Sequence, residues 1–390
     1  MKNKLNLKGI WFPIYILILI LNVTLLMPPS RKFFIDIGWR WVYMLLISFG
    51  ISFCLTPLCE LIAHHGNILD KPDTRKLHLE ATPLLGGAAV FTAFLAAILI
   101  NGIYTLKLYI ILVSASVLFV VGMMDDLREI PAWIRLASQI LCAGLVMSFG
   151  IILRVIPENF GLFSIAGNVF LTVLWIIGIT NAMNFFDGMD GLAAGVSGLI
   201  AFFLGTVAFQ TGQPFLAWIS VALMGGCLGF LPFNFRIKAR ASIFLGDAGS
   251  TVLGFLLACV AVYGKWAESD PVVALASPLL IFWILIFDMV HITIDRIITG
   301  KVANFREWID YVGKDHLHHR LANVLGGHKR SVLFIYLLIL CLGTSAIVLR
   351  YARPMDAILL IIQAFIIVGL ITILERRGRA MANTREDSEI

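Results

Sequence analysis

The sequence predicts an all-α integral membrane protein that crosses the bilayer many times. Of its 390 residues, 59% are hydrophobic and only 14% are charged, and the mean hydropathy is +0.92. Both values lie well outside the balance of a soluble globular domain. The charged residues also gather between long apolar segments rather than within them. The composition therefore excludes a soluble fold.

Twelve apolar segments are long enough to cross a hydrocarbon core of about 30 Å as helices, which takes roughly 17 to 25 residues. We place them at residues 11–29, 39–63, 84–103, 108–124, 134–154, 168–186, 192–210, 216–235, 248–264, 272–292, 331–350 and 356–374.

The spans divide the chain into three regions. Residues 1–38 form an extra N-terminal membrane anchor helix, residues 39–374 a membrane domain, and residues 375–390 a charged cytoplasmic tail that we expect to lack packed structure. The first apolar segment follows three lysines, as a signal peptide would, but no small-x-small cleavage site follows it. A retained anchor helix is therefore favoured.

The distribution of lysine and arginine sets the orientation. With the N-terminus inside, 22 of the 30 basic residues fall on the inner side, as expected for cytoplasmic segments. This bias accounts for the net charge of +6 and gives no case for nucleic-acid binding. The six cysteines lie singly in apolar segments without CxxC pairing, which is typical of buried apolar side chains rather than disulfides or metal ligands.

Polar clusters stand at the ends of four different spans, and the span count puts all four on the cytoplasmic face. Ionisable groups at such depth usually serve function in membrane proteins, so the clusters predict an active site. Their residues are Asp125 and Asp126; Asn181, Asn184, Asp187 and Asp190; Asp247; and His316, His318 and His319. Lys76, with its basic neighbours, adds a positive patch on the same face.

Each cluster also has a plain structural interpretation. Asp125 and Asp126 suit charges at a helix end, and Asp247 suits an N-cap. A glycine-rich turn explains Asp190 but leaves unexplained the polar stripe that Asn181 and its neighbours form at spacings of three. The histidines suit solvated residues or a zinc site, although their spacing without cysteine fits structural zinc poorly.

Together, the clusters favour phosphoryl transfer from a soluble nucleotide-linked donor to a lipid phosphate. Mg²⁺ binds through one or two carboxylates and substrate phosphate oxygens, and such transfer depends on positioning and charge neutralisation. A secondary transporter is the alternative from another class. Its carboxylates would lie near the membrane midplane on broken helices, whereas these stand at span ends.

The clusters resemble the signature blocks of the polyprenyl-phosphate N-acetylhexosamine-1-phosphate transferases (glycosyltransferase family 4). The resemblance runs in order from about Leu58 to Leu349. Its blocks are DKPDTRKLH (70–78), PLLGG (83–87), Asp125-Asp126, NAMNFFDGMDGLA (181–193), FLGDAGS (244–250) and HLHH (316–319).

That family transfers an aminosugar 1-phosphate from a UDP-sugar to undecaprenyl phosphate at the cytoplasmic face of the bacterial cell membrane, and it releases UMP. The resemblance implies Mg²⁺, or Mn²⁺, as the cofactor. It implies catalytic roles for Asp125, Asp126 and Asp247, with Asp247 and Asp187 on the metal and Asp125 as base or nucleophile. It implies substrate contacts from Lys76, Asn181, Asn184, Asp187, Asp190, Asn234, His316, His318 and His319.

The HLHH form resembles the branch that uses UDP-N-acetylglucosamine for O-antigen lipopolysaccharide, enterobacterial common antigen or teichoic acid linkage. The muramoyl-pentapeptide transferase of peptidoglycan synthesis is the alternative. The chain departs from the family pattern in the extra first span and in the segment Val302 to Lys314. In the N-acetylglucosamine branch an Asp commonly stands three residues before the first histidine, whereas here Asp315 stands directly before it. The expected partners are the UDP-sugar, undecaprenyl phosphate and membrane lipid, with no nucleic acid and with a homodimer left open.

Overall fold

A computed structural model describes residues 11–70, 81–266, 271–304, 307–308, 311, 313, 315–349 and 353–389, with side chains over these ranges except at residues 11, 271 and 376–389. The chain forms two compact units, Met1–Gly264 and Lys265–Ile390. The division falls inside the single membrane domain that the sequence predicted for residues 39–374. Each unit is described by itself below.

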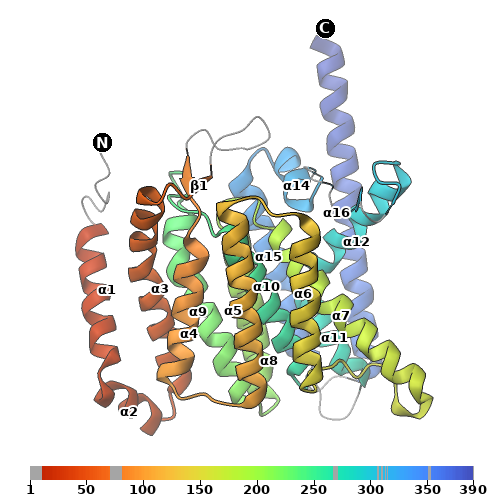
Figure 1. Ribbon diagram of the computed structural model, residues 1–390. Coiled ribbons are helices and arrows are strands. Elements are labelled where there is room, and N and C mark those ends of the chain that lie inside the picture. The colour runs from red at the N-terminus through yellow and green to blue at the C-terminus, as the bar shows by residue number, and fades with distance from the viewer. Residues whose placement is uncertain are drawn as a thin grey trace. The chain divides into compact units, whose positions relative to one another are not determined.

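The first unit is a bundle of membrane helices (Figure 1). Its helices are α1 (Trp11–Leu26), α2 (Pro28–Asp36), α3 (Arg40–His65), α4 (Gly86–Ile100), α5 (Leu106–Leu127), α6 (Ala132–Ser148), the 3₁₀ turn η1 (Glu158–Phe160), α7 (Leu162–Phe185), α8 (Leu192–Gln210), α9 (Pro214–Asn234) and α10 (Gly246–Tyr263). Two short strands, β1 (Leu69–Asp70) and β2 (Thr82–Pro83), pair antiparallel between α3 and α4. The sequence patterns had not predicted this strand pair.

The second unit is also helical. Its elements are α11 (Pro271–Ile281), α12 (Trp283–Ile298), α14 (Leu317–Leu325), α15 (His328–Val348) and α16 (Pro354–Glu389). The last helix continues through the charged segment from residue 375, where we had expected no packed structure.

The all-α membrane fold is confirmed, and a helix occupies each of the twelve predicted ranges. By length and composition, eight of the described helices can cross a membrane, or up to ten if two bent pairs each form one span. The remaining two ranges hold the shorter apolar helices α4 and α6. The predicted span at residues 272–292 is not one straight helix. It falls on α11 and α12, between which the chain bends by 78°.

Helix α10 lies at the centre of the first unit. In its most apolar 18-residue window 83% of the residues are buried, against 28% in α7, and it packs on α4, α5, α7 and α8. Figure 1 shows that α10 and α4 begin at the same end of the bundle at which α5 and α7 end, and α1 begins there too. Polar residues at these helix ends are therefore gathered around the start of one buried helix.

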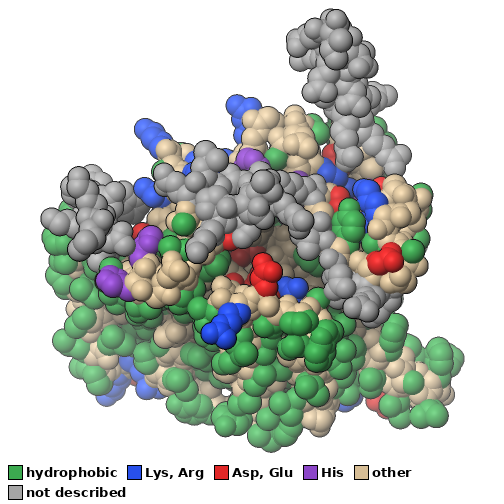
Figure 2. Space-filling model, turned by 45° about the horizontal axis from the view of Figure 1, so that its top comes forward, with side chains coloured by type: hydrophobic (Ala, Val, Ile, Leu, Met, Phe, Trp, Pro, Cys, Tyr) green, Lys and Arg blue, Asp and Glu red, His purple; other side chains and the backbone are tan. Residues whose placement is uncertain are grey.

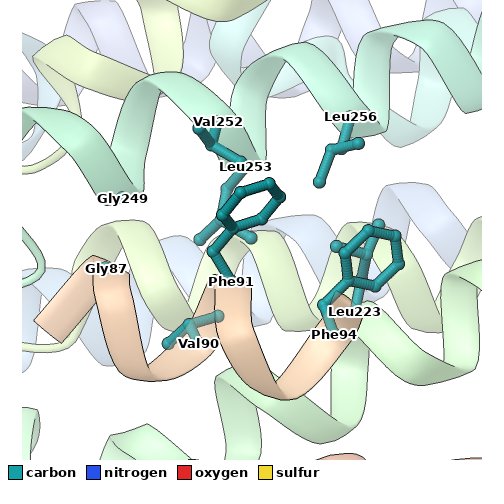
Figure 3. A pocket seen from close by; sticks show the side chains of 9 residues that line it. All are labelled: Gly87, Val90, Phe91, Phe94, Leu223, Gly249, Val252, Leu253 and Leu256. Carbon is teal, nitrogen blue, oxygen red and sulfur yellow. The ribbon is translucent and has the colours of Figure 1, made fainter. Parts of the chain in front are cut away.

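Glycines allow the helices around α10 to approach closely. A Cβ on Gly87 of α4 would lie 2.4 Å from the Cα of Gly249 in α10, and one on Gly122 of α5 would lie 2.5 Å from the Cα of Ala248. Figure 3 shows Phe91 and the other apolar side chains that line a small pocket between α4, α9 and α10 beside this contact. Small residues at helix contacts are the usual basis of packing in membranes, where lipid is as apolar as the side chains.

Backbone hydrogen bonds fix the same junction. The N–H groups of Gly86 and Gly87 donate to the carbonyls of Phe244 and Leu245 at 3.0 and 2.7 Å, and Phe244 donates to Pro83 at 2.8 Å. These bonds join two blocks that lie about 160 residues apart in the sequence. The PLLGG segment therefore holds the approach to α10 in place.

The first helix packs against the rest of the unit. Asn22 of α1 is only 6% exposed, and its amide donates to the carbonyl of Ile47 in α3 at 3.5 Å. The hydroxyl of Tyr15 donates to Cys54 O at 3.1 Å. Helix α1 is therefore part of the packed helical bundle of the first unit.

Replacing Gly87 by alanine tests the close contact of α4 with α10. We expect the free energy of unfolding to fall by about 1 to 3 kcal/mol, because backbone atoms must move to admit the methyl group. The measurement is thermal unfolding of the protein in detergent. Gly178→Ala in α7 is the matched control, since no atom lies within 4 Å of its Cβ position. Equal stability of the two variants would contradict the tight junction.

Candidate active site

Asp126 at the end of α5 holds the first turn of α10. Its two carboxylate oxygens accept hydrogen bonds from the backbone N–H groups of Asp247 at 2.8 Å and Ala248 at 3.1 Å. Gly246 enters this turn with φ of +79°, and a Cβ there would lie 2.7 Å from an oxygen of Asp126. A carboxylate is favoured at a helix N-terminus, where backbone N–H groups have no partner within the helix.

Asp247 is the carboxylate that remains open to a ligand. Its side chain is 40% exposed, and its Oδ1 accepts a hydrogen bond from the Asn184 amide at 2.8 Å. The same amide nitrogen of Asn184 donates to Ser250 Oγ at 3.0 Å. Asn184 at the end of α7 therefore orients Asp247 from the side, while Asp126 fixes its backbone.

Asp125, by contrast, is closed in. Its side chain is 6% exposed, and its oxygens accept from Ile130 N at 2.9 Å and from Arg135 Nη1 at 2.9 Å. Arg135 of α6 also lies 3.8 Å from Asp247 Oδ2. One guanidinium therefore links the carboxylate predicted as base or nucleophile to the carboxylate predicted as metal ligand.

Asp187 lies in the turn between α7 and α8, beside the other carboxylates. Burial, and then the negative charges of Asp247 and Asp126, raise the pKa of Asp187 well above its usual value, which a hydrogen bond from the Gly246 backbone only partly offsets. Carboxylates brought this close repel one another. The arrangement is unfavourable unless a proton or a cation neutralises part of the charge.

These oxygen donors fit a magnesium ion. Among the described residues, no three His, Cys, Asp or Glu side chains converge closely enough to hold a metal by themselves. Mg²⁺ does not need such a cage, because it usually takes one or two carboxylates and completes its shell with water and substrate phosphate. Asp247 and Asp187 are the two side chains that the family resemblance implies as its ligands.

Three other predicted ligand residues hold backbone or neighbouring helices. Asn234 is 3% exposed and bridges Gly191 N to Ile243 O at 2.8 and 3.0 Å. Asp190 accepts from Ala241 N at 2.8 Å. Asn181 exchanges hydrogen bonds with Gln139 of α6 at 2.7 and 3.3 Å. Their predicted substrate contacts stay untested, but the structure gives each a structural role.

The histidine segment lies in the second unit. His316 precedes α14 and is 6% exposed, with its Nδ1 2.9 Å from Asp288 Oδ2. Burial, followed by the neighbouring imidazole of His319, holds the pKa of His318 well below its usual value, so this ring is neutral at pH 7.

Asp315, directly before these histidines, forms a bidentate ion pair with Arg296 at 2.8 and 2.9 Å. Burial alone would raise the pKa of Asp315, but the hydrogen bonds and charge of Arg296 bring it below its usual value. This pair anchors the start of the histidine segment to α12. Lys76, the remaining predicted contact, lies outside the described residues.

The sequence predictions missed Arg135, Gln139 and Asp288. Each stands inside an apolar segment, which was interpreted only as a membrane span. A single polar residue in such a segment was the available signal, because charges at membrane depth are costly and usually have a partner.

The contacts place three of the four predicted clusters together at one end of the first unit. Figure 2 turns this end toward the viewer and shows acidic side chains set among other polar groups, above a flank that is mainly hydrophobic. The carboxylates therefore stand at helix ends and not at the centre of the membrane, which is unlike the midplane sites of secondary transporters.

Comparison with known proteins identifies one family. Residues 108–265, which include α5, α7 and α10, match the family described as Glycosyl transferase family 4. A Bacillus subtilis (strain 168) protein named "Probable undecaprenyl-phosphate N-acetylglucosaminyl 1-phosphate transferase" is 33% identical over 338 residues, covering 85% of this chain and 91% of its own.

Two further relatives come from other bacterial groups. A Mycobacterium tuberculosis (strain ATCC 25618 / H37Rv) protein, named decaprenyl-phosphate N-acetylglucosaminephosphotransferase, is 30% identical over 84% of this chain and 87% of its own. An Escherichia coli (strain K12) protein, named undecaprenyl-phosphate alpha-N-acetylglucosaminyl 1-phosphate transferase, is 27% identical over 79% and 84%.

The helical membrane fold, the carboxylate site and these similarities define an integral membrane glycosyltransferase. More narrowly, the chain belongs to the polyprenyl-phosphate N-acetylhexosamine-1-phosphate transferases of glycosyl transferase family 4. The resemblance drawn from the motif blocks is thereby confirmed.

The contacts of Asp126 and Asp247 predict opposite effects on stability. Asp126→Ala removes the partner of two N–H groups at the start of α10 and should lower the free energy of unfolding by about 1 to 2 kcal/mol. Asp247→Ala removes one of several mutually repelling carboxylates and should leave stability unchanged or raise it. Thermal unfolding of both variants without added divalent cation measures this. A larger loss in Asp247→Ala than in Asp126→Ala would contradict these assignments.

Proposed function

We propose that the protein transfers N-acetylglucosamine 1-phosphate from UDP-N-acetylglucosamine to undecaprenyl phosphate at the cytoplasmic face of the bacterial membrane. The observation that carries the proposal is the half-exposed Asp247, held by Asn184 and flanked by Asp187 at the start of α10. The names of the relatives support a polyprenyl-phosphate acceptor and an N-acetylglucosamine-phosphate donor.

In the proposed reaction, an oxygen of the lipid phosphate attacks the phosphorus that carries the sugar. The new bond is a P–O–P linkage between lipid phosphate and sugar phosphate, and the bond that breaks is the one to the uridine-bearing phosphate, which leaves as UMP. Such transfers depend on positioning and on neutralising phosphate charge. Bound Mg²⁺ would supply part of that neutralisation, with Asp247 and Asp187 as its ligands.

Three further side chains have separate roles in the proposed reaction. Arg135 lies between Asp125 and Asp247 and offers a cation to a phosphate that reaches Asp247. Asp125, oriented by Arg135 and by the backbone of Ile130, is the group assigned to the lipid phosphate. Asp126 holds the α10 backbone and acts by positioning Asp247.

Asp247→Asn provides the central test of this proposal. The amide keeps the size of the side chain but loses the negative charge, so transfer should fall on the order of 100-fold or more while the protein stays folded. The assay combines purified protein in lipid nanodiscs with undecaprenyl phosphate, Mg²⁺ and radiolabelled UDP-N-acetylglucosamine. It follows UMP release and the lipid-linked product.

Glu158→Gln is the matched control, because its side chain is 90% exposed and lies in η1 before α7, away from the carboxylate cluster. Parallel reactions with UDP-muramoyl-pentapeptide separate the two branches of the family. Full activity of Asp247→Asn across a Mg²⁺ titration would overturn the site assignment. Product formed only from the pentapeptide donor would replace the proposed substrate.

Cysteine labelling tests the cytoplasmic placement of the site. Ile237 is 83% exposed in the segment between α9 and α10, at the end of the first unit that carries the carboxylates. We expect Ile237→Cys to be labelled only from the cytoplasmic side, and Glu158→Cys only from the outside. Asn323→Cys in α14 extends the test to the histidine segment. A background without the six native cysteines is required, and external labelling at Ile237→Cys would reject the orientation.

A further inference from the structure

Asp288 is a buried carboxylate in the second unit that the proposed chemistry does not use. It lies in α12, just after the bend that follows α11, and is 1% exposed. Burying a carboxylate is costly unless it is hydrogen-bonded or paired with a cation. The partners of Asp288 therefore indicate why this position is acidic.

Both oxygens of Asp288 contact the histidine segment. Oδ2 lies 2.9 Å from His316 Nδ1, and Oδ1 accepts from the backbone N–H of Leu317, the first residue of α14, at 2.7 Å. His316 stands at the N-cap position of α14 but makes no capping hydrogen bond with its own side chain. Asp288 thus caps α14 from a different helix and orients the adjacent imidazole in the same contact.

The hydrogen bond to Asp288 fixes the tautomer of His316. A carboxylate accepts, so Nδ1 must carry the proton, and in the neutral ring Nε2 is then a hydrogen-bond acceptor. The rings of His316 and His318 are nearly parallel, and their centroids lie 5.8 Å apart. The ring centroids of His318 and His319 lie 4.2 Å apart. Orienting His316 therefore also constrains its neighbours.

A buried arginine ties the same cluster to the last helix. Arg320, one turn further along α14, is 7% exposed. Its guanidinium lies 3.9 Å from Asp288 and 3.4 Å from Glu375 of α16, and its Nη1 is 2.6 Å from His291 Nδ1 on α12. Three helices are thus held together around the histidine segment by paired charges, which resists reorientation of the segment.

We propose that Asp288 is a positioning residue for the transfer reaction. It holds the Nδ1 proton of His316 and the start of α14, and thereby presents Nε2 of His316 as a hydrogen-bond acceptor to a hydroxyl or N–H group of the nucleotide sugar. This inference rests on the proposed function and on the substrate contact that the family resemblance implies for His316.

Asp288→Asn is the decisive variant. An asparagine can still accept from Leu317 N through its oxygen, but its amide then donates toward His316 Nδ1 and forces the proton onto Nε2. We expect kcat/KM for the UDP-sugar to fall by about 10- to 100-fold, as when a carboxylate that orients a histidine is removed. Asp295→Asn is the matched control on the same helix, because the side chain of Asp295 is 46% exposed and pairs with Lys301.

A double-mutant cycle separates positioning from general stability. In a His316→Ala background, Asp288→Asn should change kcat/KM by less than about twofold, since its effect passes through the missing imidazole. Independent, multiplicative losses would show that Asp288 acts by another route and would overturn the inference. Thermal unfolding of each variant establishes that folded proteins are being compared.

A spectroscopic readout tests the inference without activity. Nitrogen-15 NMR of histidine-labelled protein, with His316→Ala used for assignment, should show His316 protonated at Nδ1 in the wild type and at Nε2 in Asp288→Asn. An unchanged tautomer would overturn the inference even if activity fell. A wild type that releases no UMP would reject the proposed function instead, and the tautomer measurement would still decide the contact.

Discussion

The carboxylate of Asp126 connects the end of α5 to the beginning of α10, and the geometry of the whole carboxylate site depends on this contact. It places a negative charge where two backbone N–H groups have no partner within their helix. The favourable interaction with the helix N-terminus offsets part of the repulsion from the neighbouring carboxylates. Because Asp126 binds the backbone N–H of Asp247, the backbone position from which the Asp247 side chain extends is fixed.

The surrounding backbone can adopt this arrangement only because several side chains are absent. Gly246 has the positive φ that the turn requires, and its Cβ position is taken by Asp126. Gly87 and Gly249 bring α4 against α10 with no atom between their backbones. The glycines in the PLLGG and FLGDAGS blocks are therefore part of the site through the space they leave.

The polar residues of the motif blocks serve two physical purposes. Asn234 and Asp190 bind Ile243 O and Ala241 N in the segment that enters α10, and Asn234 also binds the N–H of Gly191 at the start of α8. These backbone groups would otherwise lie unsatisfied near the membrane. Asp247 and Asn184 instead point their polar atoms at one another, and Asp247 remains half exposed. A polar motif at the membrane surface thus needs supporting residues as well as reacting ones.

The sequence was sufficient to predict the helical class, the twelve helical ranges and the acidic and amide residues near Asp247, though not Arg135, because hydropathy and local spacing encode them. It was not sufficient to predict that Asp126 reaches the backbone of Asp247, 121 residues away, or that Asn181 pairs with Gln139. Such contacts depend on how the helices pack against one another. Hydrophobic periodicity and amino-acid composition carry no information about that packing. The bend before Trp283 was not predicted, because the hydropathy of an apolar segment is the same whether its helix is straight or broken.

The amide of Asn22 has a consequence for how the chain enters the membrane during synthesis. A helix with an amide at this depth inserts less readily than a purely apolar one, and its hydrogen bond to Ile47 becomes available only once α3 is present. The first two long helices therefore reach their lowest free energy in the bilayer as a pair. An arbitrary apolar anchor in place of α1 would insert more easily, yet it would lack this hydrogen bond to α3.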